Sequence, residues 1–256
     1  IAVDPTSAFT GGAILGDRVR MQRHYLDPGV FIRSVATRGE TGGLPRIVKT
    51  MVRLLDASGM DVVIVETVGV GQTELGIMKV ADTVLVTLVP ESGDAIQALK
   101  AGVMEIADIF VVNKADREGA NQMAVAINSM LHMSEDPNQD WDTPVVLTQA
   151  ESGEGIEGLG DQIQEHRNFL TESTKLYSRR EARRKAEFLE AVEEALSQRL
   201  KLLVNSDPTF TKLIEQIAQK QAEPYSAALE LLDSEEPISD LVNNIFWHSH
   251  IVGGTS

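Results

Sequence analysis

The chain has 256 residues, 43% of them hydrophobic, which is enough to bury a full core in one or two domains. Its 23 basic and 38 acidic side chains give a formal net charge of −15, so we expect neither general nucleic-acid binding nor docking on an anionic membrane. Cysteine is absent, which excludes disulfides and thiolate metal sites, and no apolar run reaches the roughly 20 residues of a membrane-spanning helix.

Short apolar runs rich in β-branched residues predict strands, and helical patterns lie between them. The runs are residues 1–3, 62–65, 83–89, 109–112 and 145–147, and the helical patterns are residues 44–58, 95–106 and 120–131. Strands and helices in alternation predict an α/β fold with a mostly parallel, doubly wound sheet. The first residue is Ile1 rather than Met, inside an apolar run, so we expect further sequence upstream.

The pattern changes after about residue 160, where strand signals stop. Residues 161–204 predict one long helix, and two shorter helices are expected at 209–220 and 225–232, the second beginning near Pro224. We therefore expect an α/β domain over residues 1–160, a helical arm over 161–236, and a tail of unknown role over 237–256.

The sharpest motif is Asn113-Lys114-Ala115-Asp116, directly after the strand predicted at 109–112. Ligands of doubly wound sheets bind outside the carboxyl ends of the strands. A carboxylate there can accept hydrogen bonds from the ring N–H and exocyclic amine of guanine, a donor pair that adenine lacks. Asn113 can brace the base and the neighbouring loop, and the aliphatic stem of Lys114 can cover the base plane. The bland alternative is a polar loop after a strand.

A second strand end carries Glu66 and then the glycine-rich stretch that includes Gly69. In P-loop nucleotide hydrolases, an acid at this place approaches the Mg²⁺ shell and a glycine N–H contacts the γ-phosphate. Asp4, which ends the first apolar run, and Asp17, in a glycine-rich segment, offer the hard carboxylate oxygens that suit Mg²⁺. Solvated turn residues are the alternative for all of them.

Two further strand ends are informative. After residues 83–89, Asp94 and Gln97 have the spacing of a helix-capping box, and Lys100 shares the helix face of Gln97. From the residues alone, capping is the favoured reading of this segment. After residues 145–147, the loop with Gln149 and Ala150 could supply backbone groups to the O6 atom of guanine.

No G-x-x-x-x-G-K-[S/T] phosphate loop occurs in the 256 residues. The Lys that contacts the β- and γ-phosphates and the Ser/Thr on Mg²⁺ in P-loop enzymes therefore have no counterpart here.

Taken together, these segments resemble the MeaB/ArgK family of P-loop GTPases, the G-protein chaperones of adenosylcobalamin-dependent methylmalonyl-CoA mutase. The resemblance runs from Val3 to about Gly158 and is less specific in the helical region. In that family the first strand and the phosphate loop precede the residue that matches Ile1. The resemblance therefore implies a longer parent that hydrolyses GTP, and we expect these 256 residues alone to bind GTP poorly. Its carrying segments are VDPTSAFTGGAILGDRVRM, DPGVFIRSVATRG, VIVETVGVGQTE, PESGDAIQALKAGVMEIADIFVVNKADR and SGEGI.

The resemblance implies roles for the motif residues. It implies a guanine site at Asn113, Lys114, Asp116, Gln149 and Ala150, a Mg²⁺ site at Asp4, Asp17 and Glu66, hydrolytic roles for Glu66, Gly69 and Lys100, and a partner-coupling switch at Asp94, Gln97 and Lys100. This replaces the capping reading of the last segment. The implied ligands are GTP or GDP with Mg²⁺, the implied partner is methylmalonyl-CoA mutase or a related acyl-CoA mutase, and the helical arm implies a homodimer. The expected location is the cytoplasm, or the mitochondrial matrix in a eukaryote.

Two other functions remain open at this point. A nickel-inserting GTPase of the same superfamily would need Cys/His metal sites, which zero cysteines argue against. A catalytically silent nucleotide-binding or dimerisation module fits the missing phosphate loop. The retention of the other nucleotide-binding loops argues against it.

Overall fold

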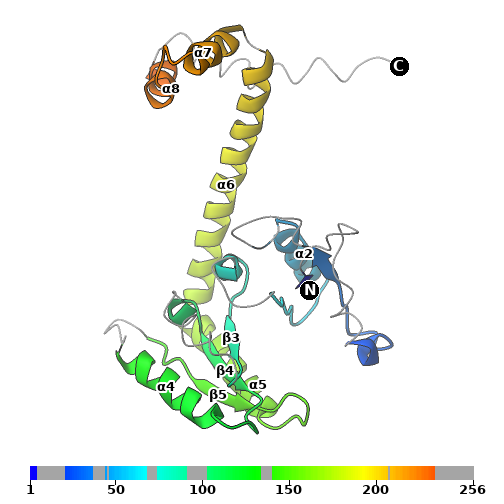
Figure 1. Cartoon of the computed structure of the whole chain (residues 1–256). Coiled ribbons are helices and arrows are strands. Elements are labelled where there is room, and N and C mark those ends of the chain that lie inside the picture. Colours follow the sequence, from blue (N-terminus) through cyan, green and yellow to red (C-terminus); the bar gives the residue numbers. More distant parts are fainter. Residues whose placement is uncertain are drawn as a thin grey trace. The chain divides into compact units, whose positions relative to one another are not determined.

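The computed structural model describes residues 1–4, 21–36, 44, 46–67, 74–90, 103–133, 140–206 and 208–233 (Figure 1). The chain divides into two compact units, Ile1–Glu181 and Ala182–Ser256. The first unit contains parallel strands with helices between them, so the predicted α/β fold class is confirmed. Within the described ranges, no helix combines the length and apolar character needed to cross a lipid bilayer.

The best-packed part of the first unit is a parallel sheet in the order β3-β4-β5. Its strands are β3 (Leu85–Leu88), β4 (Ile109–Asn113) and β5 (Val145–Thr148), close to the predicted runs. β4 lies between its two neighbours and is apolar and buried from Ile109 to Val112, as expected of a strand covered on both faces. β3 differs from that expectation, because Leu85 and Thr87 are exposed while Val86 and Leu88 are buried.

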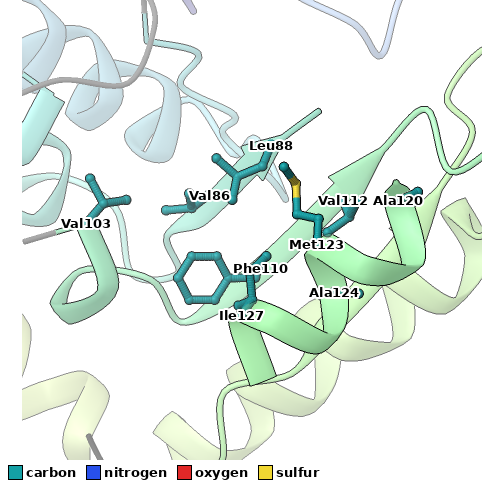
Figure 2. Packing of buried hydrophobic residues seen from close by; sticks show 9 residues of the cluster. All are labelled: Val86, Leu88, Val103, Phe110, Val112, Ala120, Met123, Ala124 and Ile127. Atoms are coloured by element: carbon teal, nitrogen blue, oxygen red, sulfur yellow. The ribbon is translucent and has the colours of Figure 1, made fainter. Parts of the chain in front are cut away.

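Helix α4 (Ala120–Met133) covers one face of this sheet and confirms the helix predicted at 120–131. Its Met123, Ala124 and Ile127 meet the strand side chains in a single apolar cluster (Figure 2). Phe110 and Ile127 are completely buried at the centre of this packing. Burying each such side chain contributes about 1.5–3 kcal/mol, so this cluster fixes the position of β4.

A separate pair of parallel strands, β1 (Ala2–Asp4) and β2 (Ser34–Ala36), opens the chain. β2 was not predicted, because only one of its three residues, Val35, is β-branched and no alternation marks the segment. The regular strand expected at 62–65 is wrong, since none is found there. The segment nevertheless lies beside β1: Glu66 forms an isolated parallel bridge to Ala2, and the Ile64 carbonyl accepts from the Ile1 amino group at 2.7 Å.

Helix α2 (Arg46–Ala57) confirms the helix predicted at 44–58 and buries Val48 completely. Short 3₁₀ turns are found at η1 (Gln22–His24), η2 (Glu74–Lys79) and η3 (Val103–Glu105). Most of the helix expected at 95–106 lies outside the described residues. Its last described part, η3, is a 3₁₀ turn.

The single helix predicted over 161–204 is wrong. The structure has α5 (Ile156–Glu172) and then α6 (Lys175–Ser206), separated by Ser173 and Thr174. The Ser173 hydroxyl donates to the carbonyl of Phe169 at 2.6 Å, and Thr174 adopts a left-handed φ of 60°. Side-chain bonding to the preceding turn competes with helix continuation, and no Gly or Pro marks the place.

The domain boundary expected at residue 160 falls inside α5. This helix packs on β4 and β5 and belongs to the first compact unit. Helices α7 (Pro208–Ala218) and α8 (Pro224–Asp233) agree closely with the two short helices that were predicted. Proline occupies the first position of each, where its missing N–H costs no hydrogen bond.

Candidate functional site

The carboxyl ends of β4 and β5 bring two of the predicted loops together. Asn113 is paired in register with Thr148 across the two strands. The Asn113 Oδ1 atom accepts hydrogen bonds from the Thr148 hydroxyl at 3.2 Å and from the Ala150 N–H at 3.1 Å. Asn113 therefore braces the neighbouring loop, as its motif position suggested.

The residues after Asn113 turn sharply. Lys114 has a left-handed φ of 58°, a conformation that costs a residue with a Cβ atom about 1 kcal/mol. The Ala115 N–H donates to the carbonyl of Thr148 at 3.0 Å, and the Arg117 N–H donates to that of Lys114 at 3.0 Å. These bonds hold Asp116 at the exposed tip of the turn. Backbone strain of this kind is concentrated at functional sites.

The second loop, after β5, is closed by its own backbone. The Gln149 N–H donates to the carbonyl of Glu154 at 2.9 Å, and the Gly153 N–H donates to that of Gln149 at 2.9 Å. Gly155, the residue before α5, has a φ of 75°, and a Cβ atom there would lie 2.2 Å from the carbonyl oxygen of Leu147. Only glycine fits this position, so the path of the backbone from the loop into α5 depends on Gly155.

The two loops form an exposed polar edge with defined chemistry. The exposed Asp116 carboxylate can accept hydrogen bonds, and the exposed Ala150 belongs to the second loop, where its N–H is bonded to Asn113 Oδ1. Lys114 is half-buried next to them and carries an aliphatic stem. Such an edge can bind a flat ring that presents both donors and acceptors.

The predicted metal residues are only partly described. Asp4 ends β1, and Glu66 ends the extended segment that pairs with it, where the Val3 N–H donates to the Glu66 carbonyl at 2.9 Å. Glu66 is exposed. The predicted residues Asp17, Gly69, Asp94, Gln97 and Lys100 lie outside the described residues. Within the described part, no three His, Asp or Glu side chains are grouped as a metal site would need.

A buried polar cluster at the opposite, amino ends of the strands was not predicted. His166 of α5 is completely buried, and its Nδ1 atom lies 2.9 Å from the Thr83 hydroxyl. Its Nε2 atom lies 3.2 Å from Oδ1 of Asp108 but off the direction of a good hydrogen bond, so we treat this pair as a close polar contact. The histidines are scattered along the sequence, and no pattern links His166 to Asp108.

Aromatic and basic side chains complete this group, which we call the arm-root cluster: Thr83, Asp108, Trp141, His166, Phe169 and Arg179. The Trp141 indole N–H donates to the Asp108 carbonyl at 2.8 Å, and its ring packs 4.7 Å from that of His166. Arg179, in the first turns of α6, lies 3.4 Å from the Asp108 carboxylate. The cluster therefore ties the start of α6 to the sheet.

The charge of Asp108 is set by competing effects. Burial raises the pKa of its carboxyl group, while His166, the Val84 N–H at 2.8 Å and Arg179 lower it. The lowering effects are larger together, so the pKa lies below its usual value and Asp108 is ionised at neutral pH.

Comparison with known proteins gives consistent matches. Residues 1–205 match the family model described as methylmalonyl-CoA mutase-associated GTPase MeaB. A protein of Pyrococcus abyssi that bears a GTPase name is 49% identical over 230 residues, which cover 89% of this chain and 71% of that protein. The mouse methylmalonic aciduria type A homolog, mitochondrial, is 31% identical over 90% of this chain and 54% of its own length.

A solved structure agrees with these matches. The crystal structure of a LAO/AO transport system kinase superposes with a TM-score of 0.60 at 26% identity, covering 91% of this chain and 69% of that one. Its P-loop GTPase fold is the fold class predicted for this chain.

Proposed function

Because the chain belongs to the MeaB family of GTPases, we propose that it carries the guanine-recognition site of a GTP-binding and GTP-hydrolysing chaperone of adenosylcobalamin-dependent methylmalonyl-CoA mutase. The family is one of GTP-hydrolysing enzymes related to mutase-associated chaperones. The observation that carries the proposal is the brace between Asn113 and the loop of Thr148 and Ala150, beside an exposed Asp116. In this proposal the protein acts in the cytoplasm.

Base recognition follows from hydrogen-bond chemistry. The Asp116 carboxylate would accept the two N–H donors on one edge of guanine, and the Ala150 loop would meet its O6 atom. The Lys114 stem would cover the ring. The left-handed backbone of Lys114 sets the direction of this turn, which supports a role in binding rather than in packing.

The acidic residues proposed to bind Mg²⁺ offer carboxylate oxygens, the ligand atoms that this ion prefers. Asp4 and Glu66 end adjacent parallel segments, and magnesium takes one or two carboxylates while keeping several waters. Asp17 would be the third acid near it. The ion would neutralise charge on the phosphates during hydrolysis. Gly69 and Lys100 are proposed to act beside Glu66 in hydrolysis, and Asp94, Gln97 and Lys100 to transmit the nucleotide state to the mutase.

Helix α6 supports the proposal that the protein is a homodimer. Apolar side chains recur on one face at a spacing of three and four residues, and they are between 38% and 50% exposed: Leu189, Val192, Leu196 and Leu200. A second copy of the helix would bury this stripe. Analytical ultracentrifugation should then show a dimer that Leu196→Glu dissociates, while Leu202→Glu, off the stripe, leaves it intact. A monomeric unsubstituted chain would remove this part of the proposal.

The decisive test is a change of base preference. Asparagine offers one donor and one acceptor where aspartate offers only acceptors, and xanthine has the matching edge. We expect the chain to prefer GDP to ADP in ligand-observed NMR at millimolar concentrations, and Asp116→Asn to shift the preference to the xanthine nucleotide. Equal signals for GDP and ADP in the unsubstituted chain would overturn guanine recognition.

A second measurement distinguishes a catalytically silent binding module from a GTPase. Guanine preference without phosphate release in the presence of Mg²⁺ would favour a binding module for these 256 residues. A mutase-dependent change in nucleotide release would favour the chaperone. The partner proposal is contradicted if methylmalonyl-CoA mutase neither binds the chain nor alters nucleotide exchange.

A further inference from the structure

We call the turn of residues 113–117 after β4 and the loop of residues 149–155 after β5 the base loops. Two of the elements that carry them also reach the arm-root cluster. β4 begins directly after Asp108 and ends at Asn113. α5 begins directly after Gly155, the last residue of the second loop, and carries His166 further along. The base loops and the cluster are therefore opposite ends of the same two elements, joined without an intervening flexible segment.

β4 is suited to carry a displacement from one end to the other. It is hydrogen-bonded in register on both sides, to β3 and to β5. Ile109, Phe110 and Val112 are completely buried. Its five residues span about 17 Å at the usual rise of a strand, and a close-packed interior has little room to absorb a shift. A movement of Asp108 along the strand would therefore reach Asn113.

α5 is held equally firmly at its beginning. Gly155 already lies so close to the Leu147 carbonyl that no Cβ atom fits. A rotation of α5 that moved His166 would have to move this contact, and with it the loop of Gln149 and Ala150. His166 lies 11 residues beyond Gly155, or about 16 Å along a helix.

The Asp108 carboxylate is the centre of the cluster. Its Oδ2 atom accepts from the Val84 N–H at 2.8 Å, and its Oδ1 atom faces His166 and Arg179. The side chain of Asp108 is 14% exposed and that of His166 is 0% exposed, so water offers little replacement for a lost partner. Removal of this carboxylate would loosen both elements at their common end.

We infer that Asp108 and His166 are positioning residues for the base loops, acting through β4 and α5 from the opposite edge of the sheet. The inference rests on the proposed function only in naming a guanine nucleotide as the ligand of those loops. It also means that docking of the first turns of α6, through Arg179, and order in the base loops favour each other.

Amide hydrogen exchange of the full chain without nucleotide tests the inference. The readout is exchange in the two loops, whose amides include those of Ala115, Gln149 and Ala150. Asp108→Ala should raise their exchange about tenfold relative to the amides of α4. Since α4 packs on the same sheet, a general loss of stability would raise exchange there equally. Unchanged loops, or loops that change only in step with α4, would overturn the inference.

Two further variants separate positioning from a local structural role. Asp82→Ala removes a carboxylate that binds Arg180 at the start of α6 but lies before β3 rather than β4. It should leave the base loops unchanged. Asp108→Asn keeps an acceptor for the Val84 N–H and should restore most of the loop protection. Equal effects of Asp82→Ala and Asp108→Ala would contradict the inference.

Nucleotide binding is measured separately. If GDP is preferred to ADP, Asp108→Ala should weaken GDP binding about tenfold, and Asp82→Ala should not. If the unsubstituted chain shows no such preference, the guanine assignment falls, while the exchange experiment still decides whether Asp108 positions the loops. Unaltered GDP affinity in Asp108→Ala would overturn the inference and leave the guanine assignment standing.

Discussion

The two ends of β4 are built in different ways, although the strand has only five residues. At the carboxyl end, backbone hydrogen bonds and one side-chain brace hold exposed loops. At the amino end, half-buried aromatic and carboxylate groups surround the buried His166 imidazole. A site that recognises a ligand needs exposed side chains on a fixed backbone, whereas the amino end excludes water from its polar groups. The same strand is therefore held by backbone bonds at one end and by packed side chains at the other.

The largest effect should come from a backbone position at the recognition end. Gly155→Ala places a Cβ atom on the Leu147 carbonyl oxygen and forces a left-handed backbone on alanine. We expect the free energy of unfolding to fall by at least about 3 kcal/mol in urea titrations. Gly153→Ala, with a φ of 84° and open space, should cost only about 1–2 kcal/mol. Equal losses would mean that backbone geometry does not define this loop.

The side-chain brace should matter less than the glycine. Asn113→Ala leaves the buried Thr148 hydroxyl and the Ala150 N–H without their acceptor. The free energy of unfolding should fall by about 1–3 kcal/mol in urea titrations. Asn113→Asp keeps an acceptor oxygen and is the matched control. A larger loss in the aspartate variant would show that the amide group, rather than the acceptor, is what the site requires.

At the amino end, the expected effect depends on pH. The pKa of Asp108 is lower in the folded chain than its ordinary value of about 3.9, so its ionised form stabilises the fold. That contribution is complete above the unfolded pKa and is lost as the pH falls through the folded one. Asp108→Asn should therefore flatten the decline of the melting temperature below about pH 4. An unchanged acid decline would mean that the carboxylate does not stabilise the cluster.

The smallest effect is expected at an ion pair beside the arm-root cluster. Arg180 pairs with Asp82, but about half of its side chain is exposed. Arg180→Gln should lower the free energy of unfolding by less than about 1 kcal/mol at low salt, and by less still at high salt. A loss comparable to that of Asn113→Ala would show that the Arg180–Asp82 pair is coupled to the arm-root cluster.

Local signals in the sequence predicted most of the fold. β4 and α4 follow from apolar runs and helical periodicity, and the turn after Asn113 follows from its place at a strand end. The break between α5 and α6 at Thr174 was not predicted. Ser and Thr are compatible with a helix, and the break appears only because the Ser173 hydroxyl donates to the carbonyl of the preceding turn. The segment at 62–65 has a strand composition, but pairing depends on a partner that composition does not show.

The arm-root cluster could not be predicted for a different reason. Asp108 and His166 are far apart in the sequence; Asp108 lies inside a segment that carries the family resemblance but received no role there, and His166 lies in no motif. Their contact arises only when α5 returns along the sheet. By contrast, the base loops are contiguous stretches at strand ends, so Asn113, Lys114 and Asp116 could be read directly.

Trp141 gives the cluster a native optical reporter. The chain has two tryptophans, Trp141 and Trp247, so Trp247→Phe would leave one indole, packed against His166 and bonded to the Asp108 carbonyl. Its emission would change when the packing of the imidazole beside it changes or when the first turns of α6 leave the sheet. Events at the root of the helical arm can thus be followed in real time without an attached dye.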